Sequence, residues 1–101
     1  MVADAAAPGR MVAAHSMPQL AAGVRLHEDR VRGLWVLLAP ERVIVPDPVC
    51  LEVLHRVDGK TRFDELVAEL AARHAAPPAT IARDVAELLV GFHERGWLVF
   101  R

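Results

Sequence analysis

The sequence contains few of the residues and runs that several classes of protein require. Its 101 residues include a single cysteine, Cys50, which excludes an internal disulfide and a cysteine-rich zinc site. The longest apolar run is far shorter than the roughly 20 residues of a membrane helix. The first residues also lack the basic-then-apolar order of a secretory signal. We therefore expect a cytoplasmic protein that does not bind a membrane.

Motifs of common catalytic sites are missing as well. There is no glycine-rich phosphate loop, no Gly-x-Ser-x-Gly elbow and no His-Glu-x-x-His pair. Cys50 lies in an apolar stripe, where we expect a small core residue. The five histidines are scattered along the chain: His15, His27, His55, His74 and His93. The sequence predicts no catalytic residue, no metal site and no cofactor.

The composition is that of one small folded domain. Apolar residues make up 53% of the chain, and 12 basic residues stand against 13 acidic ones. This balance is inconsistent with disorder throughout, and the length suits one core. Residues 1–23 are rich in alanine and follow no helical or strand period. We expect them to form a flexible N-terminal tail, followed by a folded domain over residues 24–101.

The apolar period changes halfway along that domain. Three short segments have strand character: residues 24–27, 34–38 and 42–45. Asp47-Pro48 then resembles a helix start, and three stripes of helical period follow, divided near Gly59 and at Pro77-Pro78. Residues 97–100 form a last short strand. The order predicts an α+β fold of winged helix-turn-helix type, with a three-stranded antiparallel N-terminal sheet, three helices and a short C-terminal strand.

A helix-turn-helix raises the question of DNA binding. The third helix would be the one that enters the groove of DNA. It carries Arg83 and Arg95 against Asp84, Glu87 and Glu94. An acidic helix is poorly suited to a surface of phosphates. We therefore expect no nucleic-acid partner.

The third predicted strand lies at a sheet edge unless the C-terminal strand pairs with it. Arg42 and Pro46 flank an apolar Val43-Ile44-Val45. These three residues are either plain core residues behind a protected edge, or a surface on which an extended peptide adds a strand. Periodicity alone leaves both readings open.

Four segments of the chain form a recognisable pattern: Leu37-Leu38-Ala39-Pro40-Glu41-Arg42-Val43, Asp58-Gly59 with Thr61, Ile81-Ala82-Arg83-Asp84-Val85, and Gly96. In their order and spacing they resemble one known family, the PqqD proteins of pyrroloquinoline quinone (PQQ) biosynthesis. The resemblance covers residues 18–100, and the chain departs from it at Pro46-Asp47-Pro48.

The resemblance implies a non-catalytic peptide chaperone, the precursor-peptide recognition element of the pathway. Such a protein binds the ribosomal precursor peptide PqqA and presents it to the radical-SAM enzyme PqqE. The peptide would lie along the third strand and against the third helix. The implied peptide-binding residues are Arg42, Val43, Ile44, Val45, Arg83, Val85, Leu88 and Leu89.

Two alternatives stay open at this point. The same module could serve another ribosomal peptide-maturation pathway, or the chain could be a winged-helix DNA-binding regulator. We expect a monomer in solution, although the open edge and the hinge at residues 46–48 permit a domain-swapped dimer.

Overall fold

The computed structural model describes residues 12–101. The elements in chain order are strands β1 (Pro18–Leu20), β2 (Arg25–Asp29), β3 (Leu34–Ala39) and β4 (Arg42–Ile44), helices α2 (Pro48–Leu54), α3 (Phe63–His74) and α4 (Pro78–Glu94), and strand β5 (Leu98–Phe100). The predicted α+β class, the three-stranded antiparallel sheet, the three helices after it and the C-terminal strand are confirmed. The winged helix-turn-helix label stays a prediction.

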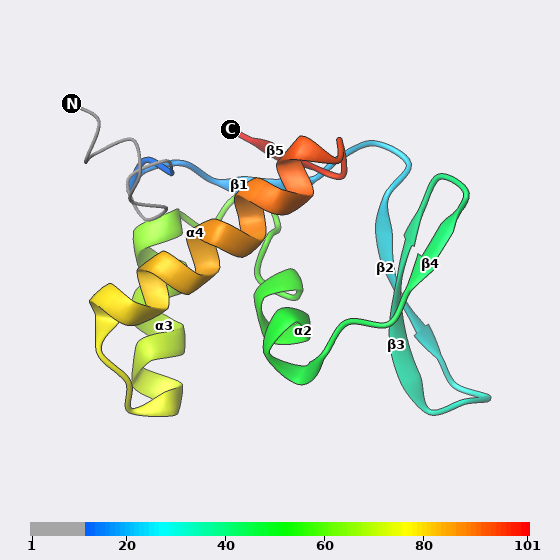
Figure 1. Cartoon of the computed structure of the whole chain (residues 1–101), viewed down its shortest axis with the longest axis horizontal. Coiled ribbons are helices and arrows are strands. Elements are labelled where there is room, and N and C mark those ends of the chain that lie inside the picture. Colours follow the sequence, from blue (N-terminus) through cyan, green and yellow to red (C-terminus); the bar gives the residue numbers. More distant parts are fainter. Residues whose placement is uncertain (1–11) are drawn as a thin grey trace.

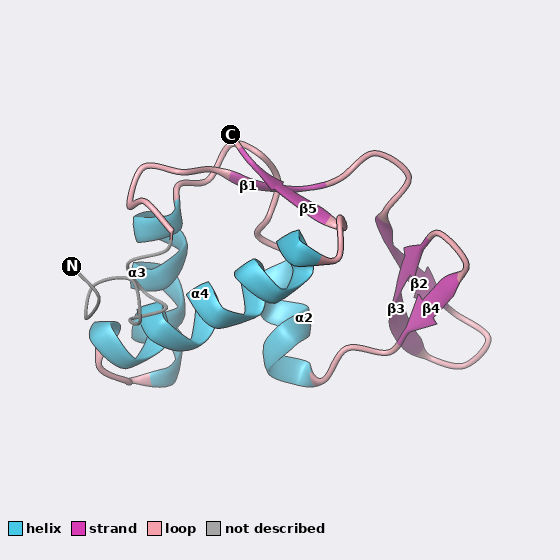
Figure 2. Cartoon of the chain, turned by 45° about the horizontal axis from the view of Figure 1, so that its top comes forward, coloured by secondary structure: helices cyan, strands magenta, loops and turns pink. Residues whose placement is uncertain are grey.

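The strands form two separate sheets. The larger sheet has the order β2-β3-β4, and the smaller one pairs β1 with β5. The three-stranded sheet stands at one end of an elongated molecule of 46 × 29 × 22 Å, beyond α2 (Figure 1). The β1–β5 pair lies along the helices, away from that sheet (Figure 2). Among residues 12–101, β4 therefore has no partner strand on its outer side.

The chain before residue 24 packs on the domain from residue 12 onward. Val12 is only 4% exposed, and Met17 exchanges two backbone hydrogen bonds with Arg101, of 3.1 and 3.0 Å. The sequence predicts a flexible tail here, because the apolar side chains of residues 1–23 follow no helical or strand period, and β1 itself has only three residues. Their structure depends on pairing with the far end of the chain, which local pattern does not report. Residues 1–11 of the predicted tail lie outside the described residues.

The helix starts follow from local hydrogen bonds. The Cys50 backbone N–H donates to Asp47 Oδ1 at 2.8 Å, which caps α2 as predicted. Helix α3 begins after Arg62, whose backbone N–H donates to Glu65 Oε1 at 3.0 Å. Gly59 has φ +76°, and a Cβ there would lie 2.8 Å from the Gln19 side chain. That close approach requires glycine.

One hydrophobic core joins the larger sheet, the helices and β5. Its most buried side chains are Leu37, Val53, Leu66, Leu89 and Leu98, all at most 1% exposed. Each buried leucine contributes about 1.5–3 kcal/mol to folding, so this cluster holds the sheet against the helices. Within residues 12–101, no helix is both long enough and apolar enough to cross a membrane.

Candidate functional site

Strand β4 is an edge strand with exposed apolar side chains. Val43 is 68% exposed, and Val45, just beyond the strand, is 63% exposed. Ile44 points to the other face of the sheet, where it packs against the core. Arg42 is exposed at the start of the strand. An edge that keeps valines in solvent is poorly protected against pairing with another chain.

The pairing register identifies which backbone groups of β4 face outward. Ala39 pairs with Arg42 across a two-residue turn, and Leu37 pairs with Ile44. In a hairpin of this length the residues flanking the turn form the closing hydrogen-bonded pair. Because such pairs alternate along antiparallel strands, Ile44 bonds to β3 and the N–H and C=O of Val43 point to the free side. Val43 thus offers one donor and one acceptor to an added strand.

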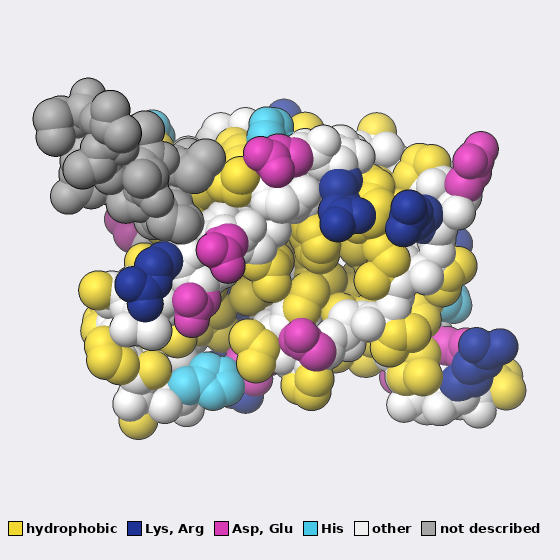
Figure 3. Space-filling model, viewed as in Figure 1, with side chains coloured by type: hydrophobic (Ala, Val, Ile, Leu, Met, Phe, Trp, Pro, Cys, Tyr) yellow, Lys and Arg dark blue, Asp and Glu magenta, His cyan; other side chains and the backbone are white. Residues whose placement is uncertain are grey.

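A groove runs beside α4, next to the end of β4. Its deeper part is a cavity of about 180 Å³ between α2, α3 and α4, and a more open part of about 430 Å³ continues along α4 toward its C-terminus. We call both parts together the α2–α4 groove; they share Asp47, Cys50, Asp84 and Leu88. Hydrophobic side chains gather in the hollow between α4 and the three-stranded sheet (Figure 3).

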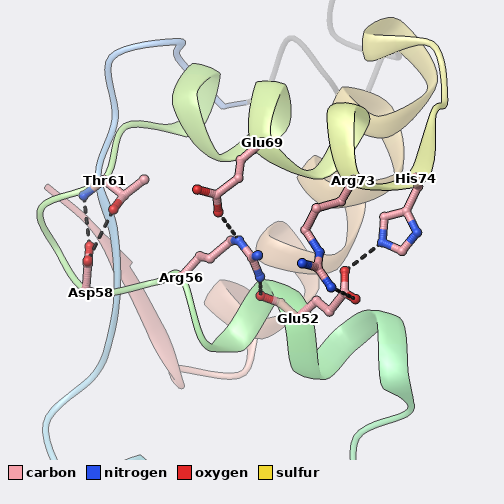
Figure 4. Close-up of polar contacts among 7 residues, drawn as sticks. All are labelled: Glu52, Arg56, Asp58, Thr61, Glu69, Arg73 and His74. Atoms are coloured by element: carbon pink, nitrogen blue, oxygen red, sulfur yellow. Dashed lines mark hydrogen bonds and ion pairs between the residues drawn. The ribbon is translucent and has the colours of Figure 1, made fainter.

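A polar cluster fixes the position of α2 against α3 at the closed end of the groove (Figure 4). Glu52 on α2 contacts His74 Nε2 at 2.6 Å and Arg73 at 3.5 Å, both on α3. Arg56 pairs with Glu69 and donates to the Glu52 carbonyl oxygen at 2.7 Å. The hydrogen bond from His74 lowers the pKa of Glu52 below its ordinary value, so its carboxylate is charged at neutral pH.

The groove walls are apolar at the bottom and acidic at the rim. Partial burial, and to a lesser extent the Asp47 charge, raises the pKa of Cys50 to about 11. Its thiol is therefore protonated at neutral pH and behaves as an apolar wall. Asp47, Asp84 and Glu87 line the open part, and none of them forms an ion pair with another residue of the described part of the chain. Arg95, at the other end, lies over the Trp97 ring at 5.2 Å.

The predicted site residues divide into three groups. Arg42, Val43, Ile44 and Val45 share the β4 edge, and Leu88 lines the groove on α4. Val85 and Leu89 are 5% and 0% exposed and belong to the core, although Val85 also lines the bottom of the cavity. Arg83 is exposed on α4 but does not line the groove.

The other groove residues are not among the peptide-binding residues that the sequence predicts. Asp47 and Cys50 were assigned to a cap and to the core, and both assignments describe only part of what they do. On α4, Asp84 precedes Leu88 by one helical turn, and Gly91 and Arg95 follow Leu88 at helical spacing. A glycine inside a helix was the one available signal, because it is unfavourable there.

The scattered histidines stay scattered in the structure. Among residues 12–101, no three His, Cys, Asp or Glu side chains come together as metal ligands would. His74 bonds to Glu52, and His93 Nδ1 lies 2.8 Å from the carbonyl oxygen of Leu98. These contacts join elements of the fold. What the geometry provides is a strand edge beside a groove, which is an arrangement for binding an extended chain.

Comparison with known proteins places this arrangement in a family. The sequence matches the profile of coenzyme PQQ synthesis protein D (PqqD) over residues 35–98. A PqqA binding protein of Xanthomonas euvesicatoria is 48% identical over 81 residues, covering 80% of this chain and 88% of the relative. One from Rhizobium meliloti is 42% identical over 85 residues, covering 84% and 83%.

Two solved structures resemble the chain. The first is the PqqD part of Methylobacterium extorquens PqqCD, a stand-alone recognition element for ribosomally synthesised and post-translationally modified peptides. It has a TM-score of 0.67 and 38% identity, covering 81% of this chain and 87% of that one. The second is PqqD of Xanthomonas campestris, with a TM-score of 0.52 and 44% identity, covering 76% and 86%. On its sequence and its fold together, this chain belongs to the PqqD family.

Proposed function

We propose that this chain binds the precursor peptide PqqA in PQQ biosynthesis, as its relatives named PqqA binding protein do. The peptide adds a strand to the free edge of β4, and its side chains enter the α2–α4 groove. The protein then presents the peptide to the radical-SAM enzyme PqqE and performs no chemistry itself. The observation that carries this proposal is the unpaired edge of β4, with Val43 68% exposed next to an apolar groove.

The free edge of β4 and the rim of the α2–α4 groove are close enough in the chain for one extended peptide to contact both. An added strand lies about 4.8 Å from β4. Beyond Ile44 the chain leads within three residues to Asp47 on the groove rim. A peptide paired to β4 therefore passes the mouth of the groove. Backbone hydrogen bonds to Val43 give affinity with little demand on sequence, and the groove selects side chains at alternate positions of the peptide.

The alternatives receive less support. The groove rim carries Asp47, Asp84 and Glu87, and carboxylates repel the phosphates that dominate binding to DNA. The family match favours the PQQ pathway over another peptide-maturation pathway. We also propose a monomer in solution, because pairing of β4 with a second copy would compete with the peptide for the same edge.

Replacing Val43 by proline tests the proposal. Proline removes the outward N–H without removing a β3–β4 hydrogen bond, and edge strands tolerate it. One hydrogen bond contributes about 1 kcal/mol net, and the ring also obstructs the added strand. We expect the folded variant to bind PqqA about tenfold or more weakly in isothermal titration calorimetry.

Glu28→Pro is the matched control on the opposite edge of the sheet. His27 pairs with Val36 and Glu28 with Trp35, and the same alternation of pairs puts the Glu28 N–H on the outer side of β2. We expect this variant to bind PqqA like the unmodified protein. Equal affinity of the Val43→Pro variant would reject strand addition at β4.

A further inference from the structure

We propose that Gly91 and its neighbours form a subsite for a long basic side chain, lysine or arginine, of the bound peptide. The inference rests on the proposed function and specifies which residue of the peptide the groove selects. The subsite is the open part of the α2–α4 groove around Gly91. Leu88, Phe92 and Cys50 form its apolar walls.

No contact within the described residues accounts for the glycine at this position. Gly91 lies inside the 17-residue helix α4, three residues before its end, where glycine is less favourable than alanine. A Cβ built at Gly91 would meet no atom within 4 Å. No packing contact in the part of the chain that the structure describes therefore requires glycine here. The absence of a side chain leaves open space at this point of the groove, where a side chain of the bound peptide can lie over the helix.

The charges around the subsite specify the chemistry of that partner residue. Asp47, Asp84 and Glu87 line the same open part of the groove as Gly91. They form no ion pair among residues 12–101. Arg95 lines the same part of the groove one helical turn after Gly91, but its guanidinium lies over the Trp97 ring. A lysine or arginine combines an apolar stem with a charged head. Its stem fits over Gly91 and Leu88 while its head reaches the carboxylates.

A shorter or acidic side chain uses the subsite less well. An aspartate or glutamate there would face three carboxylates and a single guanidinium, that of Arg95, and the excess of like charge disfavours such a contact. A small apolar residue would leave the space over Gly91 empty. Because the groove begins at Asp47, three residues after β4, a strand added to β4 can place one side chain at this position. The proposal thus concerns one peptide residue and one region of α4.

The test compares Gly91→Ala with a control on the same helix. Thr80→Ala also raises the helix propensity of α4, but Thr80 is exposed and does not line the groove. Both variants should raise the midpoint of thermal unfolding. Calorimetric titration with the PqqA peptide of Xanthomonas campestris should show about tenfold weaker binding for Gly91→Ala and unchanged binding for Thr80→Ala.

Peptide variants complete the experiment. Each lysine and arginine of the peptide is replaced in turn by glutamine. One replacement should weaken binding to the unmodified protein about tenfold and have a much smaller effect on the Gly91→Ala variant, because both changes remove the same contact.

The outcomes separate the two proposals. If the unmodified protein does not bind PqqA, the proposed function is wrong. If it binds and Val43→Pro weakens binding, while Gly91→Ala binds normally or no basic residue of the peptide matters, the subsite is wrong and strand addition remains.

Discussion

Two adjacent leucines of α4 separate the roles of core and groove. Leu89 is 0% exposed and belongs to the central cluster. Leu88 is half-buried and lines both parts of the groove. Changing each to alanine removes the same atoms from neighbouring positions of one helix. We expect Leu89→Ala to reduce stability and Leu88→Ala to reduce peptide affinity.

The magnitudes follow from burial. A fully buried leucine replaced by alanine costs about 3–5 kcal/mol, because a cavity remains. For a domain of this size each kcal/mol lowers the midpoint of thermal unfolding by about 4–8 °C, so Leu89→Ala should lower it by at least about 12 °C. Leu88 is only half-buried, and its truncation should cost about 1 kcal/mol of stability. The lost contact with the peptide should weaken binding about five- to tenfold.

The assay pairs thermal unfolding, followed by circular dichroism, with calorimetric titration of PqqA. Titrations are made well below the midpoint of the Leu89→Ala variant, so that all three proteins are folded. A Leu89→Ala variant that is folded but binds PqqA far more weakly than Leu88→Ala would refute the assignment of Leu89 to the core and Leu88 to the groove. Such a result would mean that Leu89 itself contacts the peptide.

Two further predictions concern single titratable groups. Hydrogen bonds from the Lys60 and Thr61 backbone lower the pKa of Asp58 below 3.8, so its contribution to stability is complete above that pH and is lost as the pH falls through the folded value. The midpoint of thermal unfolding should fall between pH 6 and pH 2, and the fall should be shallower in the Asp58→Asn variant. The same pH dependence in both proteins would contradict a stabilising role of the Asp58 carboxylate. Cys50, with a pKa of about 11, should react slowly with iodoacetamide at pH 7, faster as the pH rises, and more slowly again with saturating PqqA. Equal rates with and without peptide, measured by mass spectrometry, would place the peptide away from the groove.

Much of the fold could be predicted because its elements have strong local patterns. The apolar stripe of α3 and the Asp47-Pro48 start of α2 each depend on residues that are close together in sequence. Strand β1 was missed because it forms only through pairing with β5, eighty positions away along the chain. The end of α2 was misplaced for a related reason: Gly59 ends no helix and instead packs under Gln19.

The candidate site was only partly predictable from sequence. The apolar edge at Val43 and Val45 could be inferred from the strand order, and the structure leaves it unpaired. On α4 the helical period could not tell Leu88 from Leu89, because adjacent positions of a broad apolar stripe both fit a core. Only the placement of α2 separates them: it opens a groove at Leu88 and leaves Leu89 enclosed.

Amide hydrogen exchange at Val43 tests the central claim most directly. In the free protein the Val43 N–H points away from β3 and should exchange quickly, while Ile44 is protected by the sheet. With saturating PqqA, we predict strong protection of Val43 and no change at Glu28 on the opposite edge. Unchanged exchange at Val43 in a complex shown by titration to be saturated would contradict strand addition at β4.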